Sequence, residues 1–450
     1  MYKVILRQAI LPVLDTFNRT QISKTLKFLE QSQWWSLEHL LELQKKKLQE
    51  ILSWTRQNSS FYNEHWKAGG EERRATSVYP ELNGLPIVNK EDLRARSRDF
   101  PLDSFTGRVL PVQTSGSTGV PMTFFRSGQQ ESWFWAIRFR MWQWAGYELG
   151  DPYLVINLNQ RLAWKKKLQD LLFRCCYLSY NANNEDSQHI LACLRRRKIV
   201  HLNGFSSTLL VLARYMKQNG IENPGVRSIT STGDDLFPDQ KKFVEAVFGV
   251  GVTDYYGAGG EGVHLASQCE YGSRYHVHME NSIVELIRDG RPAHPGETGS
   301  VVVTQLDNYP MPLIRYDLGD IATASDNAPC PCGRALQTIE SINGRACDIV
   351  CTPDGAALLP QFFFIGAFKT LEKVDRYQII QERLDRISIK LVASPGCDQP
   401  KCERALENEV TQATRGSLKV EFDWVHEIPL SGRGKFRPVI SRLSSSDRPV

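Results

Sequence analysis

Thr114-Ser115-Gly116-Ser117-Thr118-Gly119-Val120-Pro121 is the stretch around which this chain of 450 residues is organised. It follows the short apolar run 108–112, which predicts a strand that enters a tight loop. Two glycines and four hydroxyl residues allow the backbone to curl and to direct several N–H groups at one anion. The loop lacks the lysine of the G-x-x-x-x-G-K-[ST] motif, because Val120 stands there. The stretch is therefore a candidate phosphate site, although Ser/Gly/Thr clusters are ordinarily plain loops.

Composition excludes several classes of protein. Charge is nearly balanced, with 55 Lys and Arg against 50 Asp and Glu, so net charge does not indicate a nucleic-acid partner. No apolar run approaches the length of about 20 residues that spans a bilayer, and Arg7 interrupts what would be the apolar core of a signal peptide. Ten scattered cysteines favour reduced thiols and a metal site over disulfides. We expect a soluble, cytoplasmic protein without a transmembrane segment.

The predicted elements divide the chain into three parts. Residues 1–66 carry leucines at helical spacing, which predicts an N-terminal helical segment of a large domain. Residues 67–347 form the core of that domain. Strand and helix patterns alternate over 151–263, which predicts a largely parallel sheet with helices on its faces, and 282–322 predict antiparallel hairpins. Residues 348–450 predict a smaller α+β domain. The fold class is therefore α/β with a β-rich subregion.

Six short motifs occur in order along the chain: the loop 114–121, Gly233-Asp234, Tyr256-Gly257 with Glu261-Gly262, Arg315-Tyr316-Asp317-Leu318-Gly319-Asp320, Gly344-Arg345 with Asp348, and Gly434-Lys435-Phe436. In this order they resemble the adenylate-forming superfamily. Within it they look most like the phenylacetate–coenzyme A ligase branch, including its capsule-biosynthesis relatives. The resemblance covers roughly residues 50–440. It implies a mobile C-terminal domain and an enzyme that activates a carboxylic acid with ATP as an acyl-adenylate, with release of pyrophosphate.

The resemblance also implies a role for each motif. ATP or AMP would be bound by Thr114, Ser115, Gly116, Ser117, Thr118, Gly119, Gly233, Asp234, Tyr256, Gly257, Asp320 and Arg345. Among these, Tyr256 would pack against the adenine, and Asp320 would accept hydrogen bonds from the ribose hydroxyls.

Two catalytic residues and a hinge complete the set that the resemblance implies. Glu261 would hold Mg²⁺ by oxygen ligation. Lys435 would bridge the attacking carboxylate and the α-phosphate in the transition state. Asp348 would be the hinge about which the small domain turns.

Two departures from the family pattern stand out. One extra residue separates Gly257 from Glu261, and the glycines there could absorb it as a bulge. Asp234 replaces the more usual glutamate with a shorter carboxylate. Neither change removes a charge and Lys435 is intact, which favours an active enzyme over a non-catalytic scaffold that binds a partner through its N-terminal helices.

A second constellation consists of Cys269, His276, Cys330 and Cys332. Three thiolates and one imidazole are a closed tetrahedral set for zinc, which would be structural. The Cys-x-Cys spacing is tighter than the common Cys-x₂-Cys. Some members of the resembled branch carry zinc at similar positions, which favours the metal site. His278 is the competing ligand, although His276 fits the pattern better.

The identity of the substrates stays open. Coenzyme A is the acyl acceptor in the best-known relatives, and an amine acceptor, as in polysaccharide or natural-product biosynthesis, is the alternative. Nothing in the sequence chooses between them, and a homodimer is also left open. Six aromatic residues over 131–144 predict burial of that helix in the core. As pocket walls, Trp135, Phe139, Phe205 and Tyr255 would favour an aromatic or otherwise flat, apolar acid.

Overall fold

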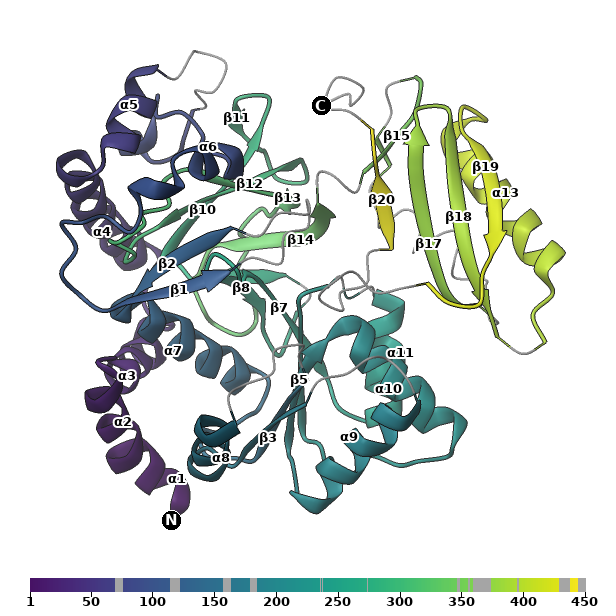
Figure 1. The fold of residues 1–450 in the computed structure, drawn as a ribbon, viewed down its shortest axis with the longest axis horizontal. Helices are drawn as coiled ribbons and strands as arrows, with labels where there is room; N and C mark the ends of the chain where they lie inside the picture. The colour runs from purple at the N-terminus through teal and green to yellow at the C-terminus, as the bar shows by residue number, and fades with distance from the viewer. Residues whose placement is uncertain are drawn as a thin grey trace. The chain divides into compact units, whose positions relative to one another are not determined.

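The computed structural model divides the chain into two compact units. The larger unit holds Met1–Gly233 and Glu245–Ile342, and the smaller holds Asp234–Val244 and Asn343–Val450. Each unit contains its own sheet and helices (Figure 1), so the predicted α/β class is confirmed. The structure describes residues 1–68, 76–113, 122–156, 163–178, 184–234, 236, 238–272, 274–345, 349–354, 357–358, 374–394, 396–428 and 438–443.

A twelve-stranded mixed sheet is the frame of the larger unit. Its order is β11-β10-β12-β13-β14-β9-β8-β7-β6-β5-β3-β4. The parallel part comprises β3 (Tyr153–Ile156), β4 (Cys175–Leu178), β5 (His201–Phe205), β6 (Ser228–Thr232) and β7 (Val252–Ala258). The rest comprises β8 (Val263–Gln268), β9 (Tyr275–Val277), β10 (Ser282–Arg288), β11 (Arg291–Pro292), β12 (Thr298–Gln305), β13 (Tyr316–Ala324) and β14 (Thr338–Arg345).

The two styles of pairing meet at β7, which pairs parallel with β6 and antiparallel with β8. Pairing is also antiparallel between β10 and β12 and between β12 and β13. The predicted parallel sheet over 151–263 and the antiparallel hairpins over 282–322 are therefore both present. They are parts of one continuous sheet, because β7 serves both.

Helices precede and cover this sheet. The N-terminal part contains α1 (Tyr2–Ile5), the π-helix η1 (Leu6–Ile10), α2 (Leu11–Asn18), α3 (Ile22–Ser32), α4 (Leu37–Asn58) and α5 (Ser60–Ala68). Short turns follow at η3 (Pro80–Leu82), α6 (Lys90–Ala95) and η4 (Ser97–Asp99). The later helices are α7 (Gly128–Trp144), α8 (Ala163–Leu172), α9 (Asn184–Arg196) and α10 (Ser206–Gln218), and α10 packs against β5 and β6. No helix in the described part of the chain is long and apolar enough to cross a membrane.

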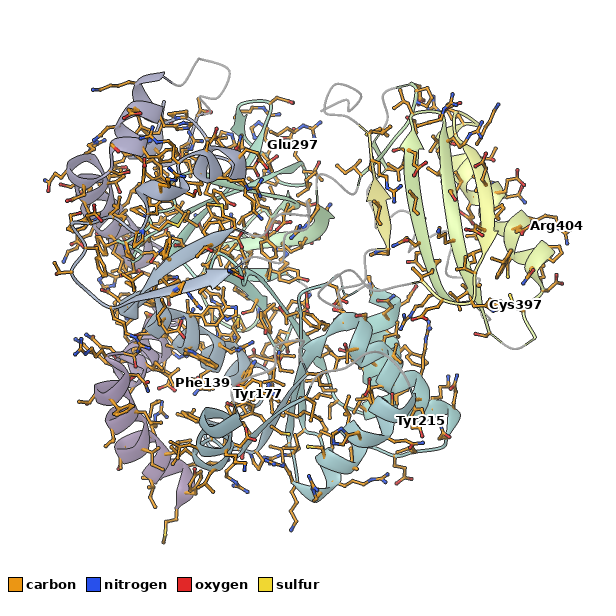
Figure 2. The ribbon with its side chains drawn as sticks, in the orientation of Figure 1. Phe139, Tyr177, Tyr215, Glu297, Cys397 and Arg404 are labelled. Carbon is orange, nitrogen blue, oxygen red and sulfur yellow. The ribbon has the colours of Figure 1, made fainter. Side chains whose placement is uncertain are left out.

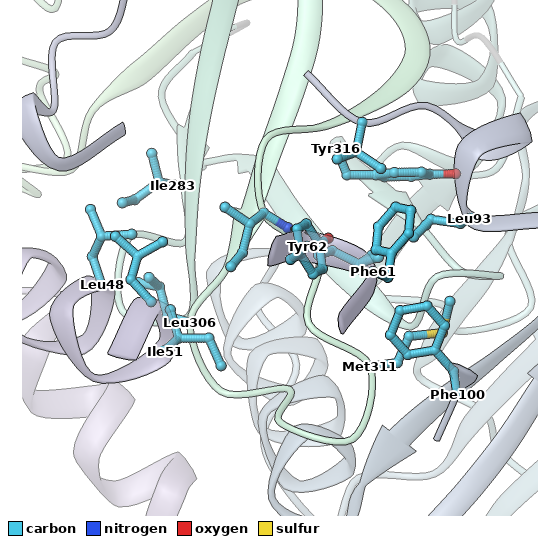
Figure 3. Close-up of a cluster of buried hydrophobic side chains, with 14 of the residues drawn as sticks. Leu48, Ile51, Phe61, Tyr62, Leu93, Phe100, Ile283, Leu306, Met311 and Tyr316 are labelled. Atoms are coloured by element: carbon cyan, nitrogen blue, oxygen red, sulfur yellow. Dashed lines mark hydrogen bonds between the residues drawn. The ribbon is translucent and has the colours of Figure 1, made fainter. Parts of the chain in front are cut away.

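Tyr62 joins the N-terminal helices to the antiparallel part of the sheet. Its hydroxyl donates to the carbonyl of Pro312 at 2.9 Å and accepts from the N–H of Ile314 at 3.1 Å. Apolar side chains surround it in one buried cluster, which Figure 3 shows with Leu48 and Ile51 of α4. Burial of this cluster fixes α4 and α5 against the strands that follow residue 280.

Helix α7 lies inside the larger unit. Ser127 caps its first turn by accepting from the N–H of Gln130 at 2.9 Å. Most of its side chains are buried, including Trp133, Phe139 and Trp142, so the predicted burial of the aromatic helix is confirmed. The helix packs against α3, β2 (Thr123–Ser127) and β8.

The smaller unit is built on a four-stranded sheet. Its strand order is β19 (Lys419–Trp424), β18 (Arg386–Ala393), β17 (Val374–Arg383) and β20 (Val439–Ser441). Helix α13 (Gln399–Thr414) begins at an Asp398 cap and buries Leu406 and Val410 with Ile387 and Ile389. A two-stranded ribbon, β15 (Val350–Cys351) and β16 (Ala357–Leu358), belongs to this unit, and α11 (Pro238–Phe248) crosses the division of the chain.

An ion pair between Arg140 and Glu280 lies in the interior of the larger unit. Both side chains are fully buried, and two hydrogen bonds of 2.5 and 3.2 Å join the guanidinium to the carboxylate. Ser32 of α3 donates to the same carboxylate at 2.6 Å, and the ring Nδ1 of His278 lies 2.9 Å from Arg140. Because every charged group is paired, the network holds α3, α7 and the segment after β9 together.

Glu280→Gln keeps the shape of the side chain but removes the counter-ion of Arg140. We expect the free energy of unfolding at pH 7 to fall by about 3 kcal/mol, because a buried charge is then left unpaired. Urea titration followed by fluorescence measures this. Glu148→Gln is the control, since Glu148 is 72% exposed in its pair with Lys3 and should contribute less than about 1 kcal/mol.

The loss of stability in Glu280→Gln should depend on pH. Burial tends to raise the pKa of Glu280, but the charge of Arg140 and hydrogen bonds from Arg140 and Ser32 hold that pKa below its ordinary value of 4.5. A depressed carboxyl pKa stabilises the fold above the unfolded-state pKa, and this contribution is lost as the pH falls through the folded-state value. The difference between wild type and Glu280→Gln should therefore shrink below about pH 4.5. A difference that stays constant down to pH 3 would contradict this account.

Candidate functional site

A β-hairpin presents the predicted phosphate loop. β1 (Val109–Gln113) and β2 pair antiparallel from Val109 opposite Ser127 to Gln113 opposite Thr123. The strands that the sequence predicts before and after the loop are thus both present. Residues 114–121 lie outside the described residues, so the binding roles of Thr114, Ser115, Gly116, Ser117, Thr118 and Gly119 stay predictions. The hairpin brings the two ends of the loop together at the Gln113–Thr123 pair.

Gly233 follows β6 at the carboxyl edge of the parallel strands. Its φ of +85° is in the left-handed region, and a Cβ there would come within 2.4 Å of the Phe205 ring at the end of β5. Only glycine fits such a position without strain. In open α/β sheets this edge is where ligands bind. Asp234, which comes next, and Arg345, which ends β14, both belong to the smaller unit.

Tyr256 of β7 and Asp320 of β13 are brought into direct contact. The tyrosine hydroxyl donates to the Asp320 carboxylate at 2.7 Å, although the two residues are far apart in the sequence. Both side chains are half-buried, so each keeps a face toward solvent. A carboxylate held in this way has acceptor capacity left for the hydroxyl groups of a ligand.

The β7–β8 hairpin carries Glu261 in its turn. The pairing shifts between Tyr256 opposite Ala266 and Gly257 opposite His264, which leaves Leu265 as an extra residue on β8. A Cβ on Gly257 would lie 2.6 Å from the Val263 carbonyl, so the strands approach too closely for a side chain. The sequence suggested a bulge at the glycines before Glu261, and the irregularity instead falls on the returning strand.

Acidic side chains gather around the start of β13. Burial raises the pKa of Tyr316, and the negative charges of Glu261 and Asp317 raise it further. Burial also raises the pKa of Asp317, against the hydrogen bond that its carboxylate accepts from the N–H of Gly319 at 2.8 Å, and the charge of Asp320 adds to it. Glu261, Asp317 and Asp320 therefore share one electronegative region, which suits a hard cation with oxygen ligands.

Asp317 belongs to this region, although sequence reasoning assigned it no role. The motif Arg315–Asp320 contains both Asp317 and Asp320, but a short motif does not reveal that both are half-buried and that the charge of one acts on the other. Lys435 and Asp348 lie outside the described residues, so their catalytic and hinge roles stay predictions.

The four predicted zinc ligands come together in a second site. The ligand atoms of Cys269, His276, Cys330 and Cys332 all lie within 4.8 Å of one another. The sulfurs of Cys269 and Cys330 are 3.5 Å apart, and Cys332 Sγ is 3.5 Å from the Nε2 of His276. A tetrahedral zinc with Zn–S bonds of about 2.3 Å separates its ligands by roughly 3.8 Å. The residues present therefore fit a zinc ion.

Protonation in this site is consistent with metal binding. Burial lowers the pKa of His276 to about 4, and the charge of Arg334 adds to the effect, so the imidazole is neutral at pH 7, as a ligand must be. Burial raises the pKa of Cys269 to about 12, so the thiol would lose its proton only to a bound cation. His278, the competing ligand, lies against Arg140 and is not in the group of four.

A group of hydrogen bonds and aromatic contacts connects the proposed metal site to the N-terminal helices. Trp144 of α7 packs edge-on against His276 and donates to the Gln33 side chain at 2.7 Å. Arg334 donates to the same Gln33 oxygen at 3.3 Å, and its guanidinium carbon lies 4.4 Å from the Trp144 ring centroid. Arg334 also pairs with Glu270 at 3.0 Å. These contacts hold the segments that carry the four proposed metal ligands against the rest of the larger unit.

Comparison with known proteins extends these observations. The family model of the CapK C-terminal domain matches residues 350–442. Protein CapK of Staphylococcus aureus is 23% identical over 422 residues, which cover 90% of this chain and 90% of that protein. A phenylacetate-coenzyme A ligase of Thermus thermophilus is 29% identical over 38% of this chain and 40% of the ligase. An indoleacetate–lysine synthetase of Pseudomonas savastanoi is 23% identical over 54% of this chain and 61% of that protein.

Solved structures show the same fold. A crystal structure of 2-hydroxyisobutyryl-CoA ligase in the postadenylation state, in complex with R3-HIB-AMP, superposes with a TM-score of 0.69. It is 17% identical and covers 90% of this chain and 89% of that chain. The order of the motifs, the mixed sheet with its smaller α+β unit, and these likenesses agree. The chain is therefore similar over nearly its whole length to protein CapK, and it has the fold of 2-hydroxyisobutyryl-CoA ligase.

Proposed function

We propose that this protein is an ATP- and Mg²⁺-dependent ligase that activates a carboxylic acid as its acyl-adenylate. The observation that carries the proposal is the hydrogen bond between Tyr256 and Asp320. The charge of Glu261 acts on Tyr316 at the start of β13, the strand that carries Asp320. The proposal combines an aromatic face, a hydroxyl-accepting carboxylate and an oxygen donor for a cation. An adenosine with its ribose hydroxyls and a metal-bound polyphosphate needs these groups together.

The chemistry explains why such groups are required. An oxygen of the substrate carboxylate attacks the α-phosphorus of ATP, the bond to the β-phosphate oxygen breaks, and pyrophosphate leaves. Two anions must meet, so their charge has to be neutralised. Mg²⁺ supplies part of that neutralisation when bound, with Glu261 as its protein ligand. Asp320 orients the ribose by accepting from its hydroxyls, and Lys435 would bridge the two reacting anions.

The acyl group then passes to a nucleophile, with AMP as the leaving group. Coenzyme A is the acceptor that the likeness to a phenylacetate-coenzyme A ligase supports. An amine, which would give an amide, is the second candidate, and the likeness to an indoleacetate–lysine synthetase supports it. Asp348 is proposed as the hinge between the two half-reactions.

Pyrophosphate release from a panel of carboxylic acids tests the proposed activity. We expect at least one acid to stimulate release by the wild type. Asp320→Asn should raise KM for ATP about tenfold or more, because a hydrogen bond to a charged group is lost. Asp326→Asn is the control, since that carboxylate is 54% exposed in a surface pair with Arg274. Release that no acid in a broad panel stimulates would argue against a ligase.

Lys435→Ala should lower kcat for pyrophosphate release by about 100-fold or more. The KM for ATP should change by less than about threefold, because the ammonium acts chiefly in the transition state. Lys419→Ala removes an exposed lysine from the same unit and should have no effect. If Lys435→Ala is well folded and releases pyrophosphate at the wild-type rate, the catalytic role is wrong.

We further propose one structural zinc ion per chain, bound by Cys269, His276, Cys330 and Cys332. Cys332→Ser should lose the metal and lower the thermal midpoint of the larger unit, because a four-ligand site stabilises the fold without an open position for substrate. Cys193→Ser, at a buried cysteine outside the group of four, should keep the metal. Elemental analysis and calorimetry measure both properties. A wild-type protein purified without zinc would refute the assignment.

A further inference from the structure

Arg138 is a cation enclosed by aromatic rings on α7. Its guanidinium carbon lies 5.8, 5.4 and 5.5 Å from the ring centroids of Phe134, Trp135 and Trp142. One terminal nitrogen donates to the hydroxyl of Tyr255 on β7 at 3.4 Å. The Nε atom is buried and has no hydrogen-bond acceptor among the described residues, which is also true of the Nε atoms of Arg126, Arg140 and Arg315. The guanidinium therefore keeps donor capacity that its protein surroundings do not use.

Arg138 is half-buried, whereas the buried arginines of the larger unit are paired with carboxylates. The pairs are Arg140 with Glu280, Arg315 with Glu285, Arg126 with Glu131 and Arg334 with Glu270, at 2.5 to 3.3 Å. Arg138 has no such partner among the residues that the structure describes. A buried charge is ordinarily paired, because desolvation without a counter-ion is costly. The guanidinium of Arg138 therefore lacks a counter-ion among the described residues, and a bound anion would supply one.

The surroundings of Arg138 are electropositive. Burial lowers the pKa of His201 to about 3, and the charge of Arg138 lowers it further. Burial, then Arg138, then Arg126 hold the pKa of His264 well below its ordinary value. Both imidazoles are consequently neutral at pH 7, and neither supplies the missing negative charge.

Arg138 is connected to the proposed adenylation site through neighbouring residues of β7. Its hydrogen-bond partner Tyr255 precedes Tyr256 on β7, so the two side chains point to opposite faces of the strand. His264 lies opposite Gly257 in the β7–β8 pairing, and its ring stacks on Phe134 at 4.2 Å. Tyr255 is also bonded to Asn203 of β5 at 3.2 Å.

The walls around Arg138 are largely apolar and come from several elements. Phe139 of α7 and Tyr177 of β4, both labelled in Figure 2, belong to one buried cluster with Tyr255. Trp135 and Phe134 are half-buried beside them. Such walls suit the body of a small acid, and the guanidinium suits a polar group at its far end.

We propose that Arg138 binds a carboxylate other than the one that is activated, so that the substrate is a dicarboxylic acid. The inference rests on the proposed adenylation of an acid at the neighbouring site. A guanidinium matches a carboxylate in two parallel hydrogen bonds, and the unused Nε supplies one of them. The sequence favours an aromatic or otherwise flat, apolar acid on account of Trp135, Phe139, Phe205 and Tyr255, and the present proposal adds an anionic end to such an acid.

Binding without ATP tests the assignment directly. Isothermal titration of the wild type with aliphatic and benzene dicarboxylic acids should identify at least one ligand whose monoamide binds about 100-fold more weakly. Arg138→Met should bind the diacid and its monoamide equally weakly, and Arg138→Lys should restore part of the preference. Arg227→Met, at a side chain that is 63% exposed, should keep the full preference. A wild type that does not distinguish any diacid from its monoamide overturns the inference.

Folding of the variants can be judged independently. Arg138→Met leaves no carboxylate of the described residues unpaired, so its thermal midpoint should stay close to that of the wild type. Arg140→Met on the same helix leaves Glu280 without its counter-ion and should melt several degrees lower. A folded Arg138→Met protein that keeps the preference for diacids would also overturn the inference.

Pyrophosphate release separates this inference from the proposed function. If the wild type binds a diacid more tightly than its monoamide but releases pyrophosphate with no acid, the Arg138 site stands and the proposed ligase activity is refuted. Equal release from diacids and monoacids, unchanged in Arg138→Met, would leave the ligase intact and refute the site. An amino acid acceptor could also present a carboxylate. If Arg138→Met slowed only acceptor-dependent turnover, and did so for an amino acid but not its amide, the anion would belong to the acceptor and the diacid assignment would be wrong.

Discussion

The alternation of side chains along β7 is the constraint on which the proposed chemistry depends. Successive residues of a strand point to opposite faces, so Tyr256 reaches Asp320 while Tyr255 reaches Arg138. The strand lies within the sheet, where it pairs parallel with β6 and antiparallel with β8. A shift of one residue in its register would turn each tyrosine to the opposite face of the sheet. The contacts of Tyr256 with Asp320 and of Tyr255 with Arg138 would then both be lost. The bulge opposite Gly257 keeps this register while the hairpin turns at Glu261.

Buried charge is distributed unevenly over the larger unit. Arg140 and Glu280 satisfy each other with help from Ser32 and His278, and the result is a fixed scaffold. Two residues earlier on the same helix, Arg138 has aromatic rings in place of a carboxylate. The first arrangement resists change because each partner depends on the other. In the second, the guanidinium of Arg138 lacks a counter-ion that a small molecule can supply, and binding sites commonly contain such a polar group.

Local patterns predicted the architecture and the group of four cysteine and histidine residues, whereas roles for Tyr256 and Asp320 came from the resemblance to a family. Alternating strands and helices predicted the parallel part of the sheet, and cysteine and histidine identities predicted the group of four ligands, because such features depend on neighbours in sequence or on side-chain chemistry. Asp317 and Arg138 could not be singled out in this way. Their character comes from burial and from partners far along the chain, as with Arg140 and Glu280, which are 140 positions apart. The irregular pairing at Leu265 likewise depends on how two strands meet.

The proposed metal centre has a topological consequence for the rest of the sheet. Cys269 and Cys330 are 61 positions apart, and the segment between them contains β9 to β13, including the strand that carries Asp320. A metal held by both thiolates would act as a cross-link that closes this segment into a loop, even in a partly unfolded chain. By the chain-entropy relation for cross-links, a loop of this length restricts the unfolded ensemble by about 4 kcal/mol. The ion would thereby bias the chain toward conformations in which the ribose-binding carboxylate is already near β7.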